Sequence, residues 1–286
     1  MSEIRIDALI PAEMAARAEL IGVRKSEMPA MTMFLLAILA GGFIALGSIF
    51  ATTVAAGSAA LPYGVARLLI GLVFCIGLIL VIVGGAELFT GNNLIVMAWA
   101  GGKVTTRALL RNWVIVYLGN FVGSIGAVLM VFLSKQYSLA GGQIGLAALN
   151  IANAKSGLEF IPALFLGILC NAMVCMAVWM TFGACSTTDK IMAIIFPIAG
   201  FVAAGFEHSI ANMYFIPMGL MIKNFDPAFT QGLIDKAVAA GGTLNFDNLT
   251  VANFFFNNLI PVTIGNIIGG GLLVGAIYWA IFLRQK

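Results

Sequence analysis

The sequence predicts an all-α integral membrane protein with six transmembrane helices in two inverted three-helix repeats, in which the second and fifth helices are broken. Three observations lead to this class. Hydrophobic residues make up 61% of the 286-residue chain and charged residues only 9%, against about 25% in a soluble domain. Apolar stretches long enough to cross a bilayer recur along the chain. Polar motifs of the first half also return, in the same order, in the second half.

The first 29 residues differ from the rest because they are polar and of mixed charge. We expect residues 1–29 to form a segment outside the membrane and residues 30–284 to form the transmembrane region. Pro11 is a favourable first residue for a short helix, with Met14, Leu20 and Ile21 on one side. The segment lacks the short apolar core of a cleavable signal peptide.

Six apolar stretches predict the membrane helices. The first, third and fourth (about residues 30–52, 109–133 and 158–182) have the length of a single crossing. The second and fifth (about 64–99 and 191–222) are too long for one straight crossing and are interrupted by glycine, glutamate and asparagine. The sixth (about 249–283) is also long and contains Pro261 and the run Gly269-Gly270-Gly271.

Basic residues predict the orientation, because positive charge concentrates on the cytoplasmic side. Five of the 15 lysines and arginines are assigned to one side of the membrane: Arg67, Lys135, Lys155, Lys223 and Lys236. The others are assigned to the opposite side: Arg5, Arg17, Arg24, Lys25, Lys103, Arg107, Arg111, Lys190, Arg284 and Lys286. Both termini are therefore predicted to be cytoplasmic, which requires an even number of crossings.

Two polar motifs indicate an internal repeat. The segment 85–92 matches 205–212 in the pattern Gly-x-Glu-x-x-x-x-Asn, and 112–123 matches 258–269 in the pattern Asn-x6-Gly-Asn-x-x-Gly. Three spans per half reverse the orientation of the second half relative to the first. We therefore predict inverted repeats over about residues 30–134 and 158–284, with broken helices meeting near the middle of the membrane.

The duplicated polar residues have two interpretations. Glu87 and Glu207 are expected to hold the helix breaks by accepting backbone N–H groups that lipid leaves unbonded; direct contact with a substrate is the alternative. Four asparagines are expected either to bond helix to helix or to line a pore: Asn92, Asn212, Asn120 and Asn266.

His208 is the only histidine, and its counterpart in the repeat is Leu88. A residue that holds the symmetric framework should appear twice, whereas one that serves the substrate can appear once. Histidine also titrates near neutral pH, so we place the substrate at His208; a neutral buried histidine bonded to a carbonyl is the alternative. Thr90 is predicted to bond the substrate or its own helix. By composition alone, the residues that bracket the breaks are ordinary packing residues: Phe74, Leu78, Leu88 and Phe201.

The remaining chemistry excludes several classes of protein. The four cysteines lie in or beside apolar spans without Cys-x-x-Cys spacing, which is typical of small buried hydrophobic residues. We find no metal-ligand cluster, no nucleotide motif and no nucleophile–base pair, so neither an enzyme nor a cofactor is expected. The absence of a basic patch also argues against a nucleic-acid partner.

Three motifs resemble the formate/nitrite transporter family, and the match covers essentially the whole chain. They are Gly205-Phe206-Glu207-His208-Ser209-Ile210-Ala211-Asn212-Met213, Ala86-Glu87-Leu88-Phe89-Thr90 and Pro261-Val262-Thr263-Ile264-Gly265-Asn266. The resemblance implies an aquaporin-like protomer, a homopentamer in the bacterial inner membrane, and a pore in each protomer for formate and related small anions. Neither break contains the Asn-Pro-Ala motif of aquaporins.

The resemblance also implies roles for individual residues. It places His208 and Thr90 at the pore centre, Phe74 and Phe201 at a periplasmic constriction, and Leu78 and Leu88 at a cytoplasmic one. Asn171 and Asn266 correspond to polar pore positions, and Lys155 to a cation on the periplasmic side. The N-terminal segment corresponds to a gate that responds to acidity; a solvated interfacial helix is the alternative.

The sequence is compatible with three transport functions. The chain is expected to be a formate channel, a nitrite or hydrosulfide channel, or a strictly proton-coupled formate symporter. In the last case His208 donates a proton to formate, and neutral formic acid passes the apolar constrictions at a lower cost than the anion does. Protons are then partners of the transport, together with the anion and the lipid bilayer.

Overall fold

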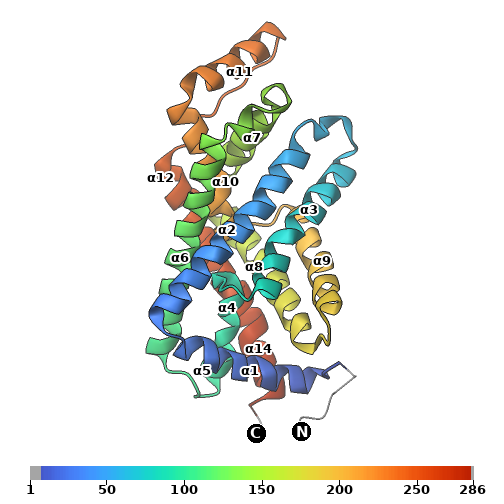
Figure 1. The fold of residues 1–286 in the computed structure, drawn as a ribbon, viewed down its shortest axis with the longest axis vertical. Helices are drawn as coiled ribbons and strands as arrows, with labels where there is room; N and C mark the ends of the chain where they lie inside the picture. The colour runs from blue at the N-terminus through green and yellow to red at the C-terminus, as the bar shows by residue number, and fades with distance from the viewer. Residues whose placement is uncertain (1–7, 285–286) are drawn as a thin grey trace.

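The computed structural model describes residues 8–284, which form helices and connecting loops without a strand (Figure 1). Six helices are long and apolar enough to cross a membrane. They are α2 (Ala30–Ala55), α3 (Tyr63–Gly84), α6 (Thr106–Leu133), α8 (Phe160–Gly183), α9 (Thr187–Ala204) and the composite span Val251–Phe282. The predicted membrane class and number of spans are confirmed.

The second and fifth apolar stretches are broken, as predicted. Helix α3 ends at Gly84, and Gly85 adopts φ +74°; helix α9 ends at Ala204, and Gly205 adopts φ +79°. Such a left-handed residue at a helix end favours glycine, which has no Cβ to clash. We call residues 85–88 the first break and residues 205–208 the second break.

Each break is followed by a further helix. After the first break come α4 (Phe89–Asn92), a 3-10 turn η2 (Asn93–Ile95) and α5 (Val96–Ala100). After the second break comes the single helix α10 (Ser209–Phe225). The helix that follows the first break is therefore divided into short pieces, whereas the one that follows the second break is continuous.

The sixth span is continuous, although it is not a regular α-helix. It consists of α12 (Val251–Asn253), a π-helical segment η5 (Phe254–Leu259), α13 (Ile260–Ile267), a second π-helical segment η6 (Ile268–Ala276) and α14 (Ile277–Phe282). Pro261 sits at the start of α13, directly after the π-helical segment η5.

Two helices outside the predicted spans are α7 (Gln143–Ser156) and α11 (Pro227–Ala239). Both are shorter than a membrane crossing, which is why a search for apolar spans does not find them. The short turns η1 (Ser58–Ala60), η3 (Gln136–Ser138) and η4 (Ala140–Gly142) complete the described elements. Figure 1 shows α1 and α14 at one end of the molecule and α11 at the other. We call these ends the α1 side and the α11 side.

The helix α1 (Pro11–Glu27) begins at Pro11, as predicted. Its buried face contains Met14, Ala15, Ala18, Gly22 and Ser26, at the spacing of one helix face. Leu20 was expected on this face but is 51% exposed. The prediction for Leu20 was wrong because the face is selected by small residues that allow close packing, and not by the largest apolar side chains.

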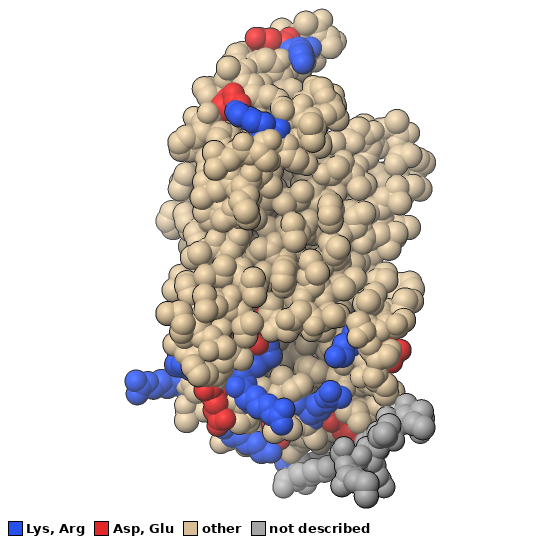
Figure 2. Space-filling model, viewed as in Figure 1, with Lys and Arg blue, Asp and Glu red and all other residues tan. Residues whose placement is uncertain are grey.

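Basic side chains gather on the α1 side in the view of Figure 2, and fewer are seen on the α11 side. The count of basic residues in the sequence likewise assigns more of them to the side that holds the termini. Two of the residues in that count, Arg5 and Lys286, lie outside the described residues.

Candidate functional site

An amide side chain from the sixth span holds the second break. Asn266 Oδ1 accepts the backbone N–H of Ser209 at 2.9 Å, and Asn266 Nδ2 donates to the carbonyls of Gly167 and Glu207 at 2.8 and 3.1 Å. The N–H of Glu207 donates to the Leu166 carbonyl at 3.3 Å. Backbone groups left open by the break are thus bonded within the protein, as a membrane interior requires.

The first break has the same arrangement. Asn120 Oδ1 accepts the N–H of Phe89 at 3.0 Å, and Nδ2 donates to the carbonyls of Ala37 and Glu87 at 2.8 and 2.9 Å. The N–H of Glu87 donates to the Leu36 carbonyl at 3.2 Å. The two asparagines that are equivalent in the sequence repeat therefore make equivalent bonds between helices.

Each break also contains a buried carboxylate. Glu207 Oε1 lies 2.7 Å from Lys155 Nζ, and Oε2 accepts from Asn212 Nδ2 at 2.6 Å. We expected this carboxylate to accept backbone N–H groups freed by the break, and that detail was wrong. Those N–H groups bond to carbonyl and amide oxygens instead, which leaves the carboxylate to neutralise the lysine.

Glu87 makes the matching contacts at the first break. Its Oε1 lies 2.7 Å from Lys25 Nζ, and its Oε2 accepts from Asn92 Nδ2 at 2.7 Å. Asn112 accepts from Asn92 at 2.9 Å and donates to the Lys25 carbonyl at 3.1 Å. Asn258 makes the corresponding bonds at the second break, to Asn212 at 2.7 Å and to the Lys155 carbonyl at 3.1 Å.

The sequence did not single out Lys25. It lies in α1, before the first apolar span, and the repeat was traced from about residue 30. The contacts show that α1 supplies to the first break what α7 supplies to the second: a lysine ammonium and the carbonyl of the same lysine. Lys25 and Lys155 are 130 positions apart, which matches neither the offset of 120 nor the offset of 146 between the repeated motifs, so the sequence repeat gave no signal for this pair.

His208 contacts Thr90 across the two breaks. His208 Nε2 lies 2.9 Å from Thr90 Oγ1, and both side chains are buried. His208 Nδ1 accepts the Ala211 backbone N–H at 3.1 Å and so caps α10. Because Nδ1 is an acceptor here, the single proton of a neutral imidazole lies on Nε2. The ring therefore donates to Thr90, and the Thr90 hydroxyl proton is free for another acceptor.

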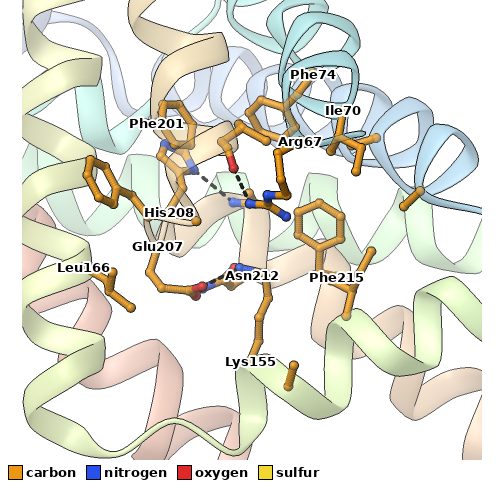
Figure 3. A pocket seen from close by; sticks show the side chains of 18 of the residues that line it. Arg67, Ile70, Phe74, Lys155, Leu166, Phe201, Glu207, His208, Asn212 and Phe215 are labelled. Atoms are coloured by element: carbon orange, nitrogen blue, oxygen red, sulfur yellow. Dashed lines mark hydrogen bonds and ion pairs between the residues drawn. The ribbon is translucent and has the colours of Figure 1, made fainter. Parts of the chain in front are cut away.

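A cavity of about 350 Å³ opens on the α11 side of this pair (Figure 3). Its wall includes Lys155, Glu207, His208, Phe74 and Phe201. The rings of Phe74 and Phe201 meet edge to face with centroids 5.8 Å apart, and Phe201 stacks on His208 at 6.0 Å. The cavity therefore ends at an aromatic wall that includes the histidine ring.

A smaller cavity of about 80 Å³ lies on the α1 side. Leu78 and Leu88 line it together with Gly22 and Lys25 of α1. Thr90 lines neither cavity and is fully buried. The two pairs of apolar side chains named from the sequence thus face different cavities, with the Thr90–His208 contact between them.

The resemblance implies polar pore positions for Asn171 and Asn266, and helix-to-helix bonding was the other interpretation of Asn266; neither residue lines either of these two cavities. Asn171 Nδ2 is within bonding distance of three oxygens: those of the carbonyls of Thr90 at 3.2 Å and Asn266 at 2.7 Å, and Asn93 Oδ1 at 2.9 Å. Its donors are used within the protein. The structure therefore gives both asparagines a role in positioning the backbone around Thr90 and His208.

Arg67 is a further residue that sequence reasoning counted only as a charge. It lies in α3 on the wall of the larger cavity. Its Nε donates to the Ala203 carbonyl at 3.2 Å and its Nη2 donates to the Val202 carbonyl. A guanidinium thus covers the carbonyl end of α9, directly before the second break. Sequence spacing gives no sign of these two contacts, because Arg67 is separated from Val202 by 135 positions and from Ala203 by 136 positions.

Ionic contacts outside the membrane lie near α11. Asp226 Oδ2 accepts from Tyr137 Oη at 2.5 Å and lies 3.0 Å from Lys135 Nζ. These hydrogen bonds, first of all that from Tyr137, hold the pKa of Asp226 below its usual range. Asp226 also accepts the Phe229 N–H at 3.2 Å and begins α11. The described residues contain no group of side chains that could hold a metal ion.

Comparisons with known proteins agree with this geometry. Residues 12–280 match the family profile described as Formate/nitrite transporter. The chain is 49% identical to the formate channel FocA of Escherichia coli K12 over 98% of this chain and 96% of that protein. It is 42% identical to the formate channel FocA of Haemophilus influenzae over 94% and 93%. A solved structure described as a pentameric formate channel with formate bound shares 47% identity and a TM-score of 0.81, over 89% of this chain and 98% of that one.

Proposed function

Since the chain belongs to the formate/nitrite transporter family, we propose that it passes formate across the bacterial inner membrane through a pore in each protomer. The family and the relatives are channels and transporters, which favours passage of the anion over any enzymatic reaction. The similar formate channel of known structure is a pentamer, and we assign the same assembly to this chain.

The observation that carries the proposal is the Thr90–His208 contact between two cavities. Formate enters from the α11 side, passes Phe74 and Phe201, and reaches the hydroxyl and imidazole groups. It leaves past Leu78 and Leu88 into the cavity on the α1 side. An anion in an apolar constriction loses hydration at a high cost, so polar donors at the midpoint are required.

The hydrogen bonds of His208 decide how it assists formate. In the observed geometry the neutral imidazole donates its Nε2 proton to Thr90, and the Thr90 hydroxyl proton is free for formate. Formate that displaces Thr90 from Nε2 accepts both hydrogen bonds in place of water. A proton transfer to formate requires the ring to take up a second proton at Nδ1 first, and the Ala211 N–H then loses its acceptor. The passive channel is therefore the primary proposal, and the strictly proton-coupled symporter is the alternative.

The orientation and the repeat are part of the proposal. Basic residues on the α1 side favour a cytoplasmic location for that side. Equivalent bonds at Asn120 and Asn266 support two inverted repeats, a form typical of membrane transport proteins. Nitrite and hydrosulfide are similar in size and charge to formate and remain alternative substrates.

We assign residues 1–29 to a gate on the α1 side. Ala18, Ile21, Gly22 and Lys25 of α1 line the smaller cavity beside Leu78 and Leu88, so α1 covers that end of the route. Deletion of residues 1–20 should increase formate flux at acidic pH in proteoliposomes. Unchanged pH dependence in the deleted protein would contradict gating by this segment.

The replacement His208→Asn tests the central assignment. Asparagine retains an amide donor and can cap α10, but it does not titrate. Formate flux in proteoliposomes should persist as an electrogenic anion current, and any proton-coupled part of the flux should be lost. Fluxes of formate, nitrite and hydrosulfide measured at two pH values identify the substrate. A pH profile identical to that of the original protein would exclude proton transfer by His208 and leave the passive channel.

A further inference from the structure

Arg67 differs from the other cation of the larger cavity in its charge balance. The Lys155 ammonium lies 2.7 Å from the Glu207 carboxylate, so this pair carries little net charge. Arg67 makes no ion pair within the described residues, where its protein partners are two backbone carbonyls. Since both cations line the same cavity, the net positive charge that an approaching anion meets comes mainly from Arg67.

The geometry of the guanidinium leaves one edge unused. Nε and Nη2 form the side edge of the group, and this edge is occupied by Ala203 and Val202. The end edge, formed by Nη1 and the second proton of Nη2, has no acceptor among residues 8–284. Two parallel N–H groups on one edge of a guanidinium match the two oxygens of a carboxylate.

Arg67 also breaks the symmetry between the repeats. At an offset of 120, which relates the two breaks, the position equivalent to Arg67 is Thr187. The described residues show no side chain from Thr187 that bonds the carbonyl end of α3. A residue that only closes a helix end in a duplicated framework should have a counterpart, as Glu87 and Glu207 do. Arg67 shares its asymmetry with His208.

We propose that Arg67 is an anion-receiving site in the cavity on the α11 side, where the end edge of its guanidinium binds the substrate carboxylate before the substrate passes Phe74 and Phe201. The side edge fixes the group in place by bonding α9, so the receiving edge is preorganised. This inference rests on the proposed formate passage, and it adds a binding step to that route. Figure 3 shows Arg67 next to Phe74 on the cavity wall.

The test compares Arg67→Gln, Arg67→Lys and the matched control Arg107→Gln, which removes an exposed arginine from the α1 side. In proteoliposomes, Arg67→Gln should raise the formate concentration that gives half-maximal flux by about three- to tenfold, as expected for loss of a charge-assisted pair at a partly exposed site. The control should leave this concentration unchanged. Adding the bulky anion gluconate should raise it for the original protein and for the control, and should not affect Arg67→Gln.

Arg67→Lys separates binding from a purely structural role. Lysine keeps the charge and can bond the α9 carbonyls, but it offers no second edge. It should restore the thermal stability of the assembled protein and still show a raised half-saturating concentration, even if Arg67→Gln does not assemble. A lysine variant that matches the original protein in both measurements would overturn the proposal. If the original protein itself carries no formate flux, it is the proposed function that fails.

Discussion

The two breaks have the same framework and different contents. Each is held by an asparagine from a later span and by a lysine–glutamate pair with ammonium and carboxylate 2.7 Å apart. At the residue before the new helix, however, the first break has Leu88 and the second has His208. Leu88 makes no cap bond, whereas His208 caps α10 and contacts Thr90. The shared part keeps an interrupted helix possible in a bilayer, and the unshared part supplies the contact that we propose for the substrate.

The lysines also differ in their surroundings. Lys25 Nζ bonds both Glu87 and Asn92 Oδ1, the latter at 2.9 Å. At the second break, Asn212 Oδ1 is buried and has no donor within the described residues, and Lys155 Nζ lies 5.5 Å from the centre of the Phe215 ring instead. The second break therefore has one hydrogen bond fewer from its lysine and faces the larger cavity.

The largest expected effect comes from removing one carboxylate. Glu207→Gln leaves the ammonium of Lys155 without its partner and removes an acceptor of both Asn212 and Asn258. Breaking a buried pair in this way costs about 3–5 kcal/mol. Glu87→Gln should cost less, because Asn112 makes no bond to Glu87 and Lys25 keeps Asn92. Thermal unfolding of the detergent-solubilised proteins gives the comparison.

The comparison tests whether Glu207→Gln loses more stability than Glu87→Gln. An equal loss for Glu87→Gln and Glu207→Gln would show that the additional Asn258 contact at 3.1 Å has no energetic weight. The double variant Glu207→Gln with Lys155→Met is the control. It removes the unpaired charge and should regain part of the lost stability.

A smaller effect on stability is expected from His208→Leu, which gives both breaks a leucine at the same position. Loss of the side-chain cap on α10 should cost about 1 kcal/mol. Formate flux should fall strongly although the free energy of unfolding changes little, because Thr90 is then the one polar donor left at the centre of the proposed route. The measurement pairs thermal unfolding with flux in proteoliposomes. Full flux in the leucine variant would show that the asymmetry between the breaks has no functional meaning.

The smallest effect is expected for the exposed ion pair at α11, which serves as a reference for the buried pairs. The pKa of Asp226 is lowered by its bonds from Tyr137 and Lys135. The unfolded chain therefore takes up a proton at a higher pH than the folded one. The stabilising contribution of Asp226 is complete above the ordinary aspartate pKa, about 3.9, and is lost as the pH falls through the lowered value.

Amide hydrogen exchange in α11 measures this reference pair. Protection at the start of the helix should decrease as the pH falls below about 4. In Asp226→Asn the decrease should be absent, because asparagine can accept the Phe229 N–H but does not titrate. An acid-dependent loss that persists in the asparagine variant would assign it to another group.

Much of this fold follows from the sequence because bilayer constraints are strict. Length and hydropathy locate the spans, and glycine with glutamate inside an apolar stretch locates both breaks. The repeat distinguishes His208, whose counterpart is Leu88, from Glu207, whose counterpart is Glu87. The sequence did not predict α7, and it did not connect α1 with the first break, because Lys25 lies in a polar segment whose hydropathy matches no membrane span.

The site was predicted less completely than the fold. His208, Thr90 and the four apolar residues fall where two cavities approach each other. The contacts of Asn266 fit the expected bonding from helix to helix, but residue type alone does not show whether an amide such as that of Asn171 faces a cavity or a backbone carbonyl. Arg67 was missed for a related reason: its partners are main-chain atoms of a distant helix, and main-chain partners leave no pattern in a sequence.

Every side chain that we place along the proposed route comes from a single chain: Arg67, Lys155, Phe74, Phe201, His208, Thr90, Leu78 and Leu88. In the proposed pentamer, such pores act as parallel conductors. An assembly that mixes intact and disabled subunits would carry current in proportion to the intact ones, without a threshold. The cell can then adjust total conductance through the number of copies it makes, and a defective copy removes only its own share.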